Sequence, residues 1–418
     1  MKIAILGYGA EGKSALRFIK KLAEYRKAVI EIRDKKIGKN YLSGLADFDL
    51  IIKTPGIPFS LPQVQKALKS GVKITGVTEL FFERAKGTII GITGTKGKGT
   101  TSTLLYAILK TAGKDAYLAG NIGTPALEVL PKLNSRSITV LELSSFQLQN
   151  LKHSPRVAII LDIFPDHLDA HKNFKEYAEA KSNITRWQNR NDAVFFVADN
   201  PITARLGKLG AGKKFPVKKE KGGAYAILGG IPLGIPGEHN RKNAALAASV
   251  AKYLGIPSAI IRQTLKKFRG MEHRLEHVAT KNNIRFINDS ASTNPNTAAA
   301  AIRAYNFPIV LIAGGSDKNL NYAPLATALR GSQVRLVVLF GENRKKIANA
   351  ISKTGIQFRF ASNLSAAVKI SYSGAKKLIA KNHEATYVLF SPAAASFDMF
   401  KNYKDRGRQF KALVKKLR

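Results

Sequence analysis

The sequence predicts an α/β protein built from three domains, because short apolar segments alternate with helical patterns in three successive runs. The 418 residues, 45% of them hydrophobic, are too many for one ordinary core and suit two or three domains. The second run starts with the apolar segment 88–93, and the third starts near Gly270. We therefore expect domains at residues 1–86, 87–270 and 271–418.

The first domain is expected to begin with a βαβ unit. Residues 2–7 read as a strand, residues 8–12 as a glycine turn, residues 13–25 as a helix and residues 28–34 as a second strand. Further strands at 50–52 and 73–74 and a helix at 61–70 complete this domain.

The second and third domains show the same alternation. In the second, the strand at 88–93 meets a glycine-rich loop and then a helix at 100–111. In the third, strands are expected at 284–288, 309–313, 336–340 and 387–390, whereas the lysine-rich stretch 213–221 of the second reads as a solvated loop. This order favours parallel sheets, whose ligands bind at the carboxyl ends of the strands, so functional residues are expected on loops.

The composition excludes several classes of protein. The absence of cysteine excludes disulfides, thiolate metal sites and cysteine nucleophiles. No apolar run reaches the ~20 residues that cross a bilayer, and the start MKIAILGYGAEGK does not resemble a signal peptide, so we expect a cytoplasmic protein without a membrane partner. The net charge of +40 is spread along the chain, which predicts a lysine-rich surface suited to anionic substrates and no nucleic-acid partner.

The first glycine turn has the pattern GxGxxG. Gly7, Gly9 and Gly12 follow a strand and precede a helix, which lets the backbone approach a pyrophosphate, and Asp34 follows at a distance where it can meet a ribose or a base. Taken alone, this pattern is compatible with NAD and a dehydrogenase, with another nucleotide, or with a structural turn.

A second phosphate loop opposes the dehydrogenase. Residues 91–101, GITGTKGKGTT, place amides and lysines between a strand and a helix, where they can hold ATP phosphates. The strict P-loop pattern is not met, because Ile92 stands at its first glycine position and Gly99 at the position of its magnesium-binding hydroxyl. We expect phosphate contacts from Gly94, Thr95, Lys96, Gly97, Lys98, Gly99, Thr100 and Thr101.

Two further residues are candidates for a cation site. Glu142 lies at the end of a strand, and Mg²⁺ prefers carboxylate oxygens, although a Glu before two serines is more often a cap or a surface residue. His167 can bind a metal or a phosphate, but a single histidine is usually structural.

Seven short motifs, spread over the second and third domains, resemble those of the Mur ligase superfamily. They are ELSSFQLQ at 142–149, DHLDAH at 166–171, GEHNRKN at 237–243, EHRLE at 272–276, NDSASTN at 288–294, GGSDK at 314–318 and SPAAASFDMFKNY at 391–403. The pieces SSFQL and SPxxASFDxF resemble the MurD branch, which adds glutamate to UDP-N-acetylmuramoyl-L-alanine.

The resemblance implies a fold and an activity. The fold would combine an N-terminal Rossmann-like domain for the UDP-sugar, a central P-loop-type ATPase sheet and a C-terminal Rossmann-like domain for glutamate, with closure about a hinge near Gly270. The activity would be ATP-dependent amide ligation of glutamate, D rather than L, through an acyl phosphate, in peptidoglycan precursor synthesis. The cofactors would be ATP and one or two Mg²⁺ ions, the partners small molecules, and the protein a monomer.

The resemblance also implies roles for individual residues. Lys98 would hold the β and γ phosphates, and Thr100, Glu142, His167 and a carbamylated Lys181 would bind magnesium. The ATP site would add Asn243, Arg274 and Asp289. The UDP-substrate site would comprise Gly9, Asp34, Gly56, Asn121, Ser144, Gln147 and His167, and the glutamate site Thr293, Lys318, Ser396 and Tyr403.

The sequence departs from the family pattern at three positions. Gly99 gives a GKGT loop that resembles the folate-ligase version, Ala291 replaces a frequent lysine, and Tyr403 replaces a frequent phenylalanine. A folate polyglutamating or other Mur-superfamily ligase, an L-glutamate-adding variant and a non-catalytic nucleotide or nucleic-acid binder remain as alternatives.

Overall fold

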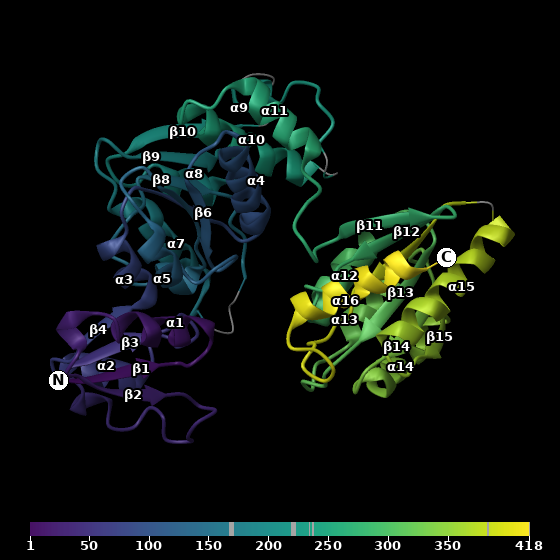
Figure 1. The fold of residues 1–418 in the computed structure, drawn as a ribbon, viewed down its shortest axis with the longest axis horizontal. Helices are drawn as coiled ribbons and strands as arrows, with labels where there is room; N and C mark the ends of the chain where they lie inside the picture. The colour runs from purple at the N-terminus through teal and green to yellow at the C-terminus, as the bar shows by residue number, and fades with distance from the viewer. Residues whose placement is uncertain (167–170, 219–222, 234, 236–237, 383, 418) are drawn as a thin grey trace. The chain divides into compact units, whose positions relative to one another are not determined.

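The computed structural model describes the whole chain except residues 167–170, 219–222, 234, 236–237, 383 and 418 (Figure 1). Its contacts divide the chain into two compact units, Met1–Phe268 and Arg269–Arg418. The first unit contains two sheets and the second contains one. Among the described helices, none combines the length and the apolar character that crossing a membrane requires.

The first sheet has four parallel strands in the order β2-β1-β3-β4. Its strands are β1 (Lys2–Leu6), β2 (Val29–Arg33), β3 (Leu50–Lys53) and β4 (Lys73–Gly76), and its helices are α1 (Ala10–Ile19), α2 (Pro62–Lys69) and α3 (Val77–Arg84), with 3₁₀ turns η1 (Ala23–Tyr25) and η2 (Leu45–Asp47). Because side chains alternate along a strand, Ile3 and Ile5 face one side of the sheet, whereas Ala4 and Leu6 face the other. The first side packs with α1 and α3 into a core that continues into the second sheet, so these two sheets form one unit.

The second sheet has six strands in the order β10-β9-β8-β5-β7-β6, and its strand pairs are parallel. The strands are β5 (Thr88–Thr93), β6 (Ala116–Gly120), β7 (Ile138–Glu142), β8 (Val157–Ile160), β9 (Ala193–Val197) and β10 (Lys213–Val217). Chain order reverses at β5, which lies between β8 and β7. The loops that follow these three strands therefore meet at one edge, which is where doubly wound sheets bind ligands.

Helices cover both faces of the second sheet. They are α4 (Lys98–Thr111), α5 (Ala126–Val129), α6 (Ser145–Leu148), α7 (Phe174–Arg186), α8 (Pro201–Gly207), α9 (Gly223–Leu228), α10 (Glu238–Tyr253) and α11 (Ser258–Lys267), with the 3₁₀ turn η3 (Leu130–Lys132). Helices α4, α10 and α11 pack together on one face (Figure 1), where their buried Leu, Ile, Val and Ala side chains form the core. Helices α5, α7 and α8 contribute to the core on the other face.

The second unit is built on a six-stranded sheet in the order β11-β12-β16-β13-β14-β15. Its strands are β11 (Glu276–Lys281), β12 (Ile284–Asn288), β13 (Ile309–Gly314), β14 (Val334–Phe340), β15 (Gln357–Phe360) and β16 (Thr386–Phe390), and its helices are α12 (Pro295–Arg303), α13 (Ala323–Leu329), α14 (Arg344–Ile351), α15 (Leu364–Asn382) and α16 (Tyr403–Lys416), with the 3₁₀ turn η4 (Ser352–Thr354). Only the β11–β12 pair is antiparallel among the described strand pairs of this sheet. Two apolar cores cover its two faces.

The α/β architecture with parallel sheets confirms the predicted fold class, and the predicted bounds of β5 and β12 agree with the structure to the residue. One prediction is wrong: residues 213–217 of the lysine-rich stretch form the edge strand β10 instead of a loop. Phe215 stacks on Phe195 of β9 with ring centroids 4.6 Å apart and meets the Tyr253 ring at 5.4 Å, so aromatic contacts and the pairing with β9 hold the strand. Residues 219–221 of that stretch lie outside the described residues.

Candidate active site

The glycine-rich loop connects the end of β5 to the start of α4. Gly94 has φ +150°, and a Cβ there would lie 2.6 Å from Leu161 Cβ; Gly97 has φ +84°, and a Cβ there would lie 2.4 Å from Asn243 Oδ1. Both positions therefore require glycine. Gly97 caps α4 without a side-chain hydrogen bond, so the amides of the first turn stay available to an anion, and Asn243 of α10 packs against this loop.

Lys98, the first residue of α4, folds back over the loop. Its Nζ donates to the carbonyl of Gly94 at 2.9 Å and to that of Thr95 at 3.0 Å. Thr95 in turn is fixed by Phe164, whose N–H donates to its Oγ1 at 2.9 Å, and Thr95 N–H donates to the carbonyl of Asp162 at 2.8 Å. The segment that follows β8 thus holds the loop in place. Lys98 can give up its two carbonyl contacts to bind a phosphate instead.

Glu142 ends β7, directly beside β5, where it pairs in register with Ile92. Its side chain is 5% exposed. One carboxylate oxygen, Oε1, accepts from Asn121 Nδ2 at 2.7 Å. The other, Oε2, is buried and has no hydrogen-bond partner among the described residues. A buried carboxylate oxygen without a partner is costly, and a cation would satisfy it.

Lys181 of α7 contacts the end of β5 and the start of the same loop. It is 1% exposed, and its Nζ donates to the Gly94 carbonyl at 3.0 Å and to Thr93 Oγ1 at 3.3 Å. The nitrogen also lies 4.7 Å from the centre of the Tyr177 ring. Burial, followed by the nearby charge of Lys98, lowers the pKa of Lys181 well below its usual value. The neutral, nucleophilic form of this amine is therefore more accessible than it is for an exposed lysine, although the charges of Asp166 and Glu142 act in the opposite direction.

Lys98 and Lys181 converge on one carbonyl, that of Gly94, and the charge of Glu142 acts on Lys181. The structure thus brings together three of the four residues expected at the catalytic centre. The fourth, His167, lies outside the described residues. Thr100 and Thr101 follow in the first turn of α4, Lys96 is exposed on the loop, and Gly99 is buried in the helix.

The residues expected around the UDP-substrate lie on both sheets of the first unit. Asp34, after β2, accepts from Tyr8 N–H at 2.6 Å and from Lys36 N–H at 2.8 Å, and these hydrogen bonds lower its pKa. Gly9 and Gly56 have open space where a Cβ would stand. Ser144 caps α6 in a capping box with Gln147, whose Nε2 donates to Glu11 Oε1 at 2.9 Å. The glycine turn of the first sheet is thereby tied to the second.

In the second unit, Asp289 follows β12 and is 5% exposed. Its carboxylate accepts from Ser391 Oγ at 2.7 Å and from Leu275 N–H at 3.2 Å. Burial raises its pKa to about 6 despite these hydrogen bonds. Arg274, one residue before Leu275, is exposed.

Three of the residues expected around glutamate, Thr293, Lys318 and Ser396, lie on the loops after β12, β13 and β16, which are neighbours in the sheet, and Tyr403 is the first residue of α16. Ser316 N–H donates to the Ala395 carbonyl at 2.9 Å, which joins the loop of Lys318 to that of Ser396. Lys318 Nζ lies 5.0 Å from the centre of the exposed Phe397 ring. Ser290 Oγ donates to the Tyr403 carbonyl at 2.8 Å, which joins the loop of Thr293 to the start of α16.

Comparison with known proteins identifies the family. The model of the Mur ligase middle domain matches residues 92–251, and that of the Mur ligase glutamate ligase domain matches residues 273–391. The chain belongs to the Mur ligase family.

Several curated relatives of this Mur ligase carry the same name. A UDP-N-acetylmuramoylalanine--D-glutamate ligase of Thermoanaerobacter sp. (strain X514) is 36% identical over 440 aligned residues, with 100% of this chain and 94% of the relative covered. That of Geobacillus kaustophilus (strain HTA426) is 38% identical over 388 residues, covering 89% of this chain and 84% of the relative.

Solved structures share the fold at lower identity. The UDP-N-acetylmuramate-alanine ligase MurC of Thermotoga maritima superposes with a TM-score of 0.59 at 22% identity and covers 99% of both chains. A folylpolyglutamate synthase of Thermotoga maritima superposes with a TM-score of 0.57 at 14% identity and covers 80% of this chain and 91% of that one.

The predicted ATP residues of this Mur ligase are divided between the two units. The glycine-rich loop and Asn243 belong to the first unit, whereas Arg274 and Asp289 belong to the second. Within each unit the predicted residues gather at the carboxyl edge of a parallel sheet, as the topology requires.

Sequence reasoning missed Arg406, which holds the loops of the second unit together. This residue of α16 is fully buried and donates to Ser290 Oγ, to the Ser290 carbonyl and to the carbonyls of Ala394 and Ala395, at 2.9–3.0 Å. Arg406 is one of 68 basic residues, and its sequence context differs from theirs only in its place 15 residues after Ser391 and directly before Gly407. That context does not predict a buried side chain.

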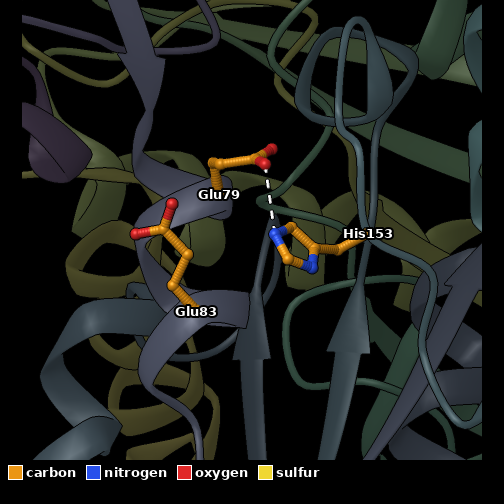
Figure 2. Close-up of side chains that lie close together, drawn as sticks. All are labelled: Glu79, Glu83 and His153. Carbon is orange, nitrogen blue, oxygen red and sulfur yellow. Dashed lines mark ion pairs between the residues drawn. The ribbon is translucent and has the colours of Figure 1, made fainter.

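Sequence reasoning also missed a cluster beside α3 (Figure 2). Glu79 and Glu83 lie one turn apart on α3, and His153 approaches from the segment after α6, with ligand atoms within 4.8 Å of one another. His153 Nε2 lies 3.2 Å from Glu79 Oε1, Lys152 N–H donates to Glu79 at 3.3 Å, and Glu83 pairs with Arg84 at 2.7 Å. The two carboxylates are therefore already paired with protein groups. The cluster connects α3 to the segment after α6.

Proposed function

We propose that this Mur ligase uses ATP to join glutamate, in its D form, to the alanine carboxylate of UDP-N-acetylmuramoyl-L-alanine. The observation that carries the proposal is the convergence of Lys98, Glu142 and Lys181 around an uncapped phosphate loop. The names of the curated relatives supply the substrates and the isomer.

The proposed reaction has two steps. An oxygen of the alanine carboxylate attacks the γ-phosphorus of ATP, an O–P bond forms, the bond to the β-phosphate oxygen breaks and ADP leaves. The amine of glutamate then attacks the acyl carbon, the C–N bond forms, inorganic phosphate leaves with the former carboxylate oxygen, and the nitrogen loses a proton. A poor leaving group thus becomes a good one without a covalent bond to the enzyme.

Lys98 and the amides of the loop would provide electrostatic stabilisation. Phosphoryl transfer depends mainly on positioning and on neutralising charge that spreads over the phosphate oxygens. Lys98 Nζ is held by two neutral carbonyls, Gly94 and Thr95, with which a phosphate competes well because an ion pair replaces neutral hydrogen bonds.

The donor set fits a magnesium ion. Glu142 offers a buried oxygen that has no hydrogen-bond partner in the described part of the chain, and the neutral amine, which the lowered pKa of Lys181 favours, is the form that reacts with carbon dioxide to give an anionic carbamate. Thr100 adds a hydroxyl from α4, and His167 is a further proposed ligand outside the described residues. A cation held there would neutralise charge on the ATP phosphates.

Glutamate would bind in the second unit, with Lys318 as the point charge for a carboxylate and with Thr293, Ser396 and Tyr403 around it. Arg274 and Asp289 would contact ATP phosphate and ribose. We retain three functional domains: residues 1–86 for the UDP-sugar, 87–270 for ATP and 271–418 for glutamate.

The test is ADP release by the purified protein. With ATP, Mg²⁺, UDP-N-acetylmuramoyl-L-alanine and D-glutamate together, we expect ADP formation. Omission of the UDP-substrate or of D-glutamate, or addition of EDTA, should abolish ADP formation. ADP release that requires a folate in place of the UDP-substrate would instead assign a folate polyglutamating ligase, the activity that the GKGT loop favours.

A further inference from the structure

The glycine turn after β1 contains a carboxylate that the proposed reaction does not use. Glu11 is the second residue of α1 and lies between Gly9 and Gly12 of the GxGxxG pattern. Its side chain does not point freely into solvent: Oε1 accepts from Gln147 Nε2 at 2.9 Å, across a sequence separation of 136 residues.

Gln147 is held at both ends of its amide. Its Oε1 accepts from Ser144 N–H at 2.9 Å within the capping box of α6, while its Nε2 donates to Glu11. The Glu11 carboxyl thus fixes the orientation of Gln147 and connects the glycine turn of the first sheet to α6 of the second.

The positive charge that acts on the Glu11 carboxylate is that of Lys53, a buried lysine at the end of β3. Lys53 is 7% exposed and donates to the carbonyls of Ile57 at 2.7 Å and Thr54 at 3.4 Å. Burial raises the pKa of Glu11 to about 7 against the opposing effects of Gln147 and Lys53, and burial lowers the pKa of Lys53 to about 8. Both groups therefore change charge near neutral pH.

The other charged groups of this turn are engaged elsewhere. Lys13 of α1 lies over the Tyr8 ring at 5.7 Å, and Asp34 after β2 accepts from the amides of Tyr8 and Lys36. From α6, the group that faces Glu11 is the uncharged Gln147. Among the charged groups of the described residues, Lys53 is therefore the one that opposes the effect of a bound anion on Glu11, together with the hydrogen bond from Gln147.

The same turn is built to receive an anion. Gly9 caps α1 without a side-chain hydrogen bond, and it has open space on its Cα side, so the first amides of this ten-residue helix can meet a phosphate. Two negative charges in one helix turn repel each other, and the titratable one can relieve the repulsion by binding a proton.

We propose that Glu11 is a positioning residue that takes up a proton from solvent when a nucleoside diphosphate binds the glycine turn, while its carboxyl continues to hold Gln147 and α6. The identity of the ligand as the UDP portion of the substrate rests on the proposed function.

Proton uptake can be measured by calorimetric titration of the full-length protein with UDP at pH 7, in two buffers that differ in ionisation enthalpy. A group half protonated before binding and fully protonated after it takes up about half a proton per UDP bound. Glu11→Gln keeps an acceptor for Gln147 but cannot titrate, so its uptake should be smaller than that of the wild type by about half a proton per UDP bound. Glu24→Gln, an exposed carboxylate of the same domain paired with Arg84, is the matched control and should retain uptake.

The pH dependence of affinity gives a second readout that a merely structural role would not produce. Between pH 6 and pH 8 the wild type should lose up to about tenfold more affinity for UDP than Glu11→Gln does, so that the variant binds UDP more tightly at pH 8.

Three results would overturn the inference: no UDP binding, binding without proton uptake, or equal uptake by Glu11→Gln. Its failure differs from failure of the proposed function. Ligase turnover without proton uptake rejects the role of Glu11 alone, whereas proton-linked UDP binding without turnover on any acceptor rejects the ligase and leaves the role of Glu11 in place.

Discussion

Lys98 and Lys181 donate to the same carbonyl of Gly94, yet their environments assign them different chemistry. Lys98 is partly exposed at the start of a helix, which suits a cation that meets incoming phosphates. Lys181 is buried beside Tyr177, which favours a neutral amine. Burial therefore distinguishes a phosphate-binding lysine from one suited to modification.

Removal of the Lys98 charge should abolish most turnover. For Lys98→Ala we expect kcat to fall by about 100-fold or more, because loss of one positioned group that stabilises charge in the transition state typically lowers kcat by that factor. The circular dichroism spectrum and melting temperature should stay close to wild type. Lys110→Ala, at the exposed end of the same helix, is the control; equal ADP release by Lys98→Ala would reject the role of the loop.

Lys181 should carry a carbamate. We expect protein equilibrated with ¹³C-bicarbonate to show a carbamate carbon resonance that is absent from Lys181→Ala, and this variant to lose most activity because an anionic ligand for the cation is gone. Lys175→Ala, on the exposed side of α7, should keep both the resonance and the activity. A resonance that persists in Lys181→Ala would assign the modification elsewhere.

Asp289 gives a pH dependence of stability with a defined sign. Its folded pKa, about 6, exceeds the ordinary value of 3.8, so the native state binds this proton more tightly than the unfolded state does. Its contribution to stability is therefore present below pH 4 and is lost as pH rises through 6, by about 3 kcal/mol once the carboxyl is fully ionised and by about 2 kcal/mol between pH 4 and pH 6. Denaturant titrations at pH 4 and pH 6 should show a smaller decrease for Asp289→Asn than for wild type; identical decreases would contradict the burial argument.

At the scale of elements, the apolar strands and the loops after them were predictable, because a buried parallel strand is a continuous apolar run that ends where the loop begins. Strand β5 has the predicted bounds, and the carboxyl-edge rule places Glu142 beside the phosphate loop. Strand β10 was missed because its two lysines give it the composition of a loop, whereas the aromatic contacts of Phe215 with Phe195 and Tyr253 come from distant residues.

Side-chain burial was not predictable from the sequence in the same way. Glu11 and Arg406 lie in segments whose local pattern is that of an exposed helix start. Glu11 contacts Gln147, 136 residues away, and Arg406 contacts Ser290, 116 residues away, as well as the nearer Ala394 and Ala395. Lys181 was assigned from the family resemblance and not from its own sequence context, which is that of an ordinary helix.

The loops of the second unit depend on α16 through Arg406. Arg406→Lys removes the guanidinium that joins the loops at Ser290 and at 394–395, and we expect the second unit to lose roughly 3 kcal/mol of unfolding free energy, with a raised KM for glutamate. Arg408→Ala, at an exposed position two residues away, should leave stability unchanged. Calorimetry measures the stability, and turnover at increasing glutamate concentration measures the KM. Wild-type stability and KM for Arg406→Lys would show that the buried guanidinium is dispensable.

At the scale of the whole molecule, the net charge of +40 creates a field that attracts anions. Both ATP and a UDP-linked substrate are polyanions, so the field favours their association. The surface charge is distributed along the chain and supplies attraction without specificity, which must come from the buried residues of the two units.

This field predicts a salt dependence of substrate binding. Raising ionic strength from about 0.05 to about 0.5 M shortens the screening length roughly threefold, so we expect KM for ATP and for the UDP-substrate to rise several-fold while kcat changes less. Replacement of chloride by a neutral osmolyte of equal osmolarity is the control. A salt-independent KM would show that the charge excess serves another purpose.

The central claim, ligation of D-glutamate to UDP-N-acetylmuramoyl-L-alanine, is tested most directly by the mass of the product. After incubation with ATP, Mg²⁺ and either D- or L-glutamate, we predict a UDP-linked product heavier by one glutamate residue with the D isomer, formed in equal amount to ADP. An unchanged substrate mass with both isomers, from protein that binds ATP, would contradict the account.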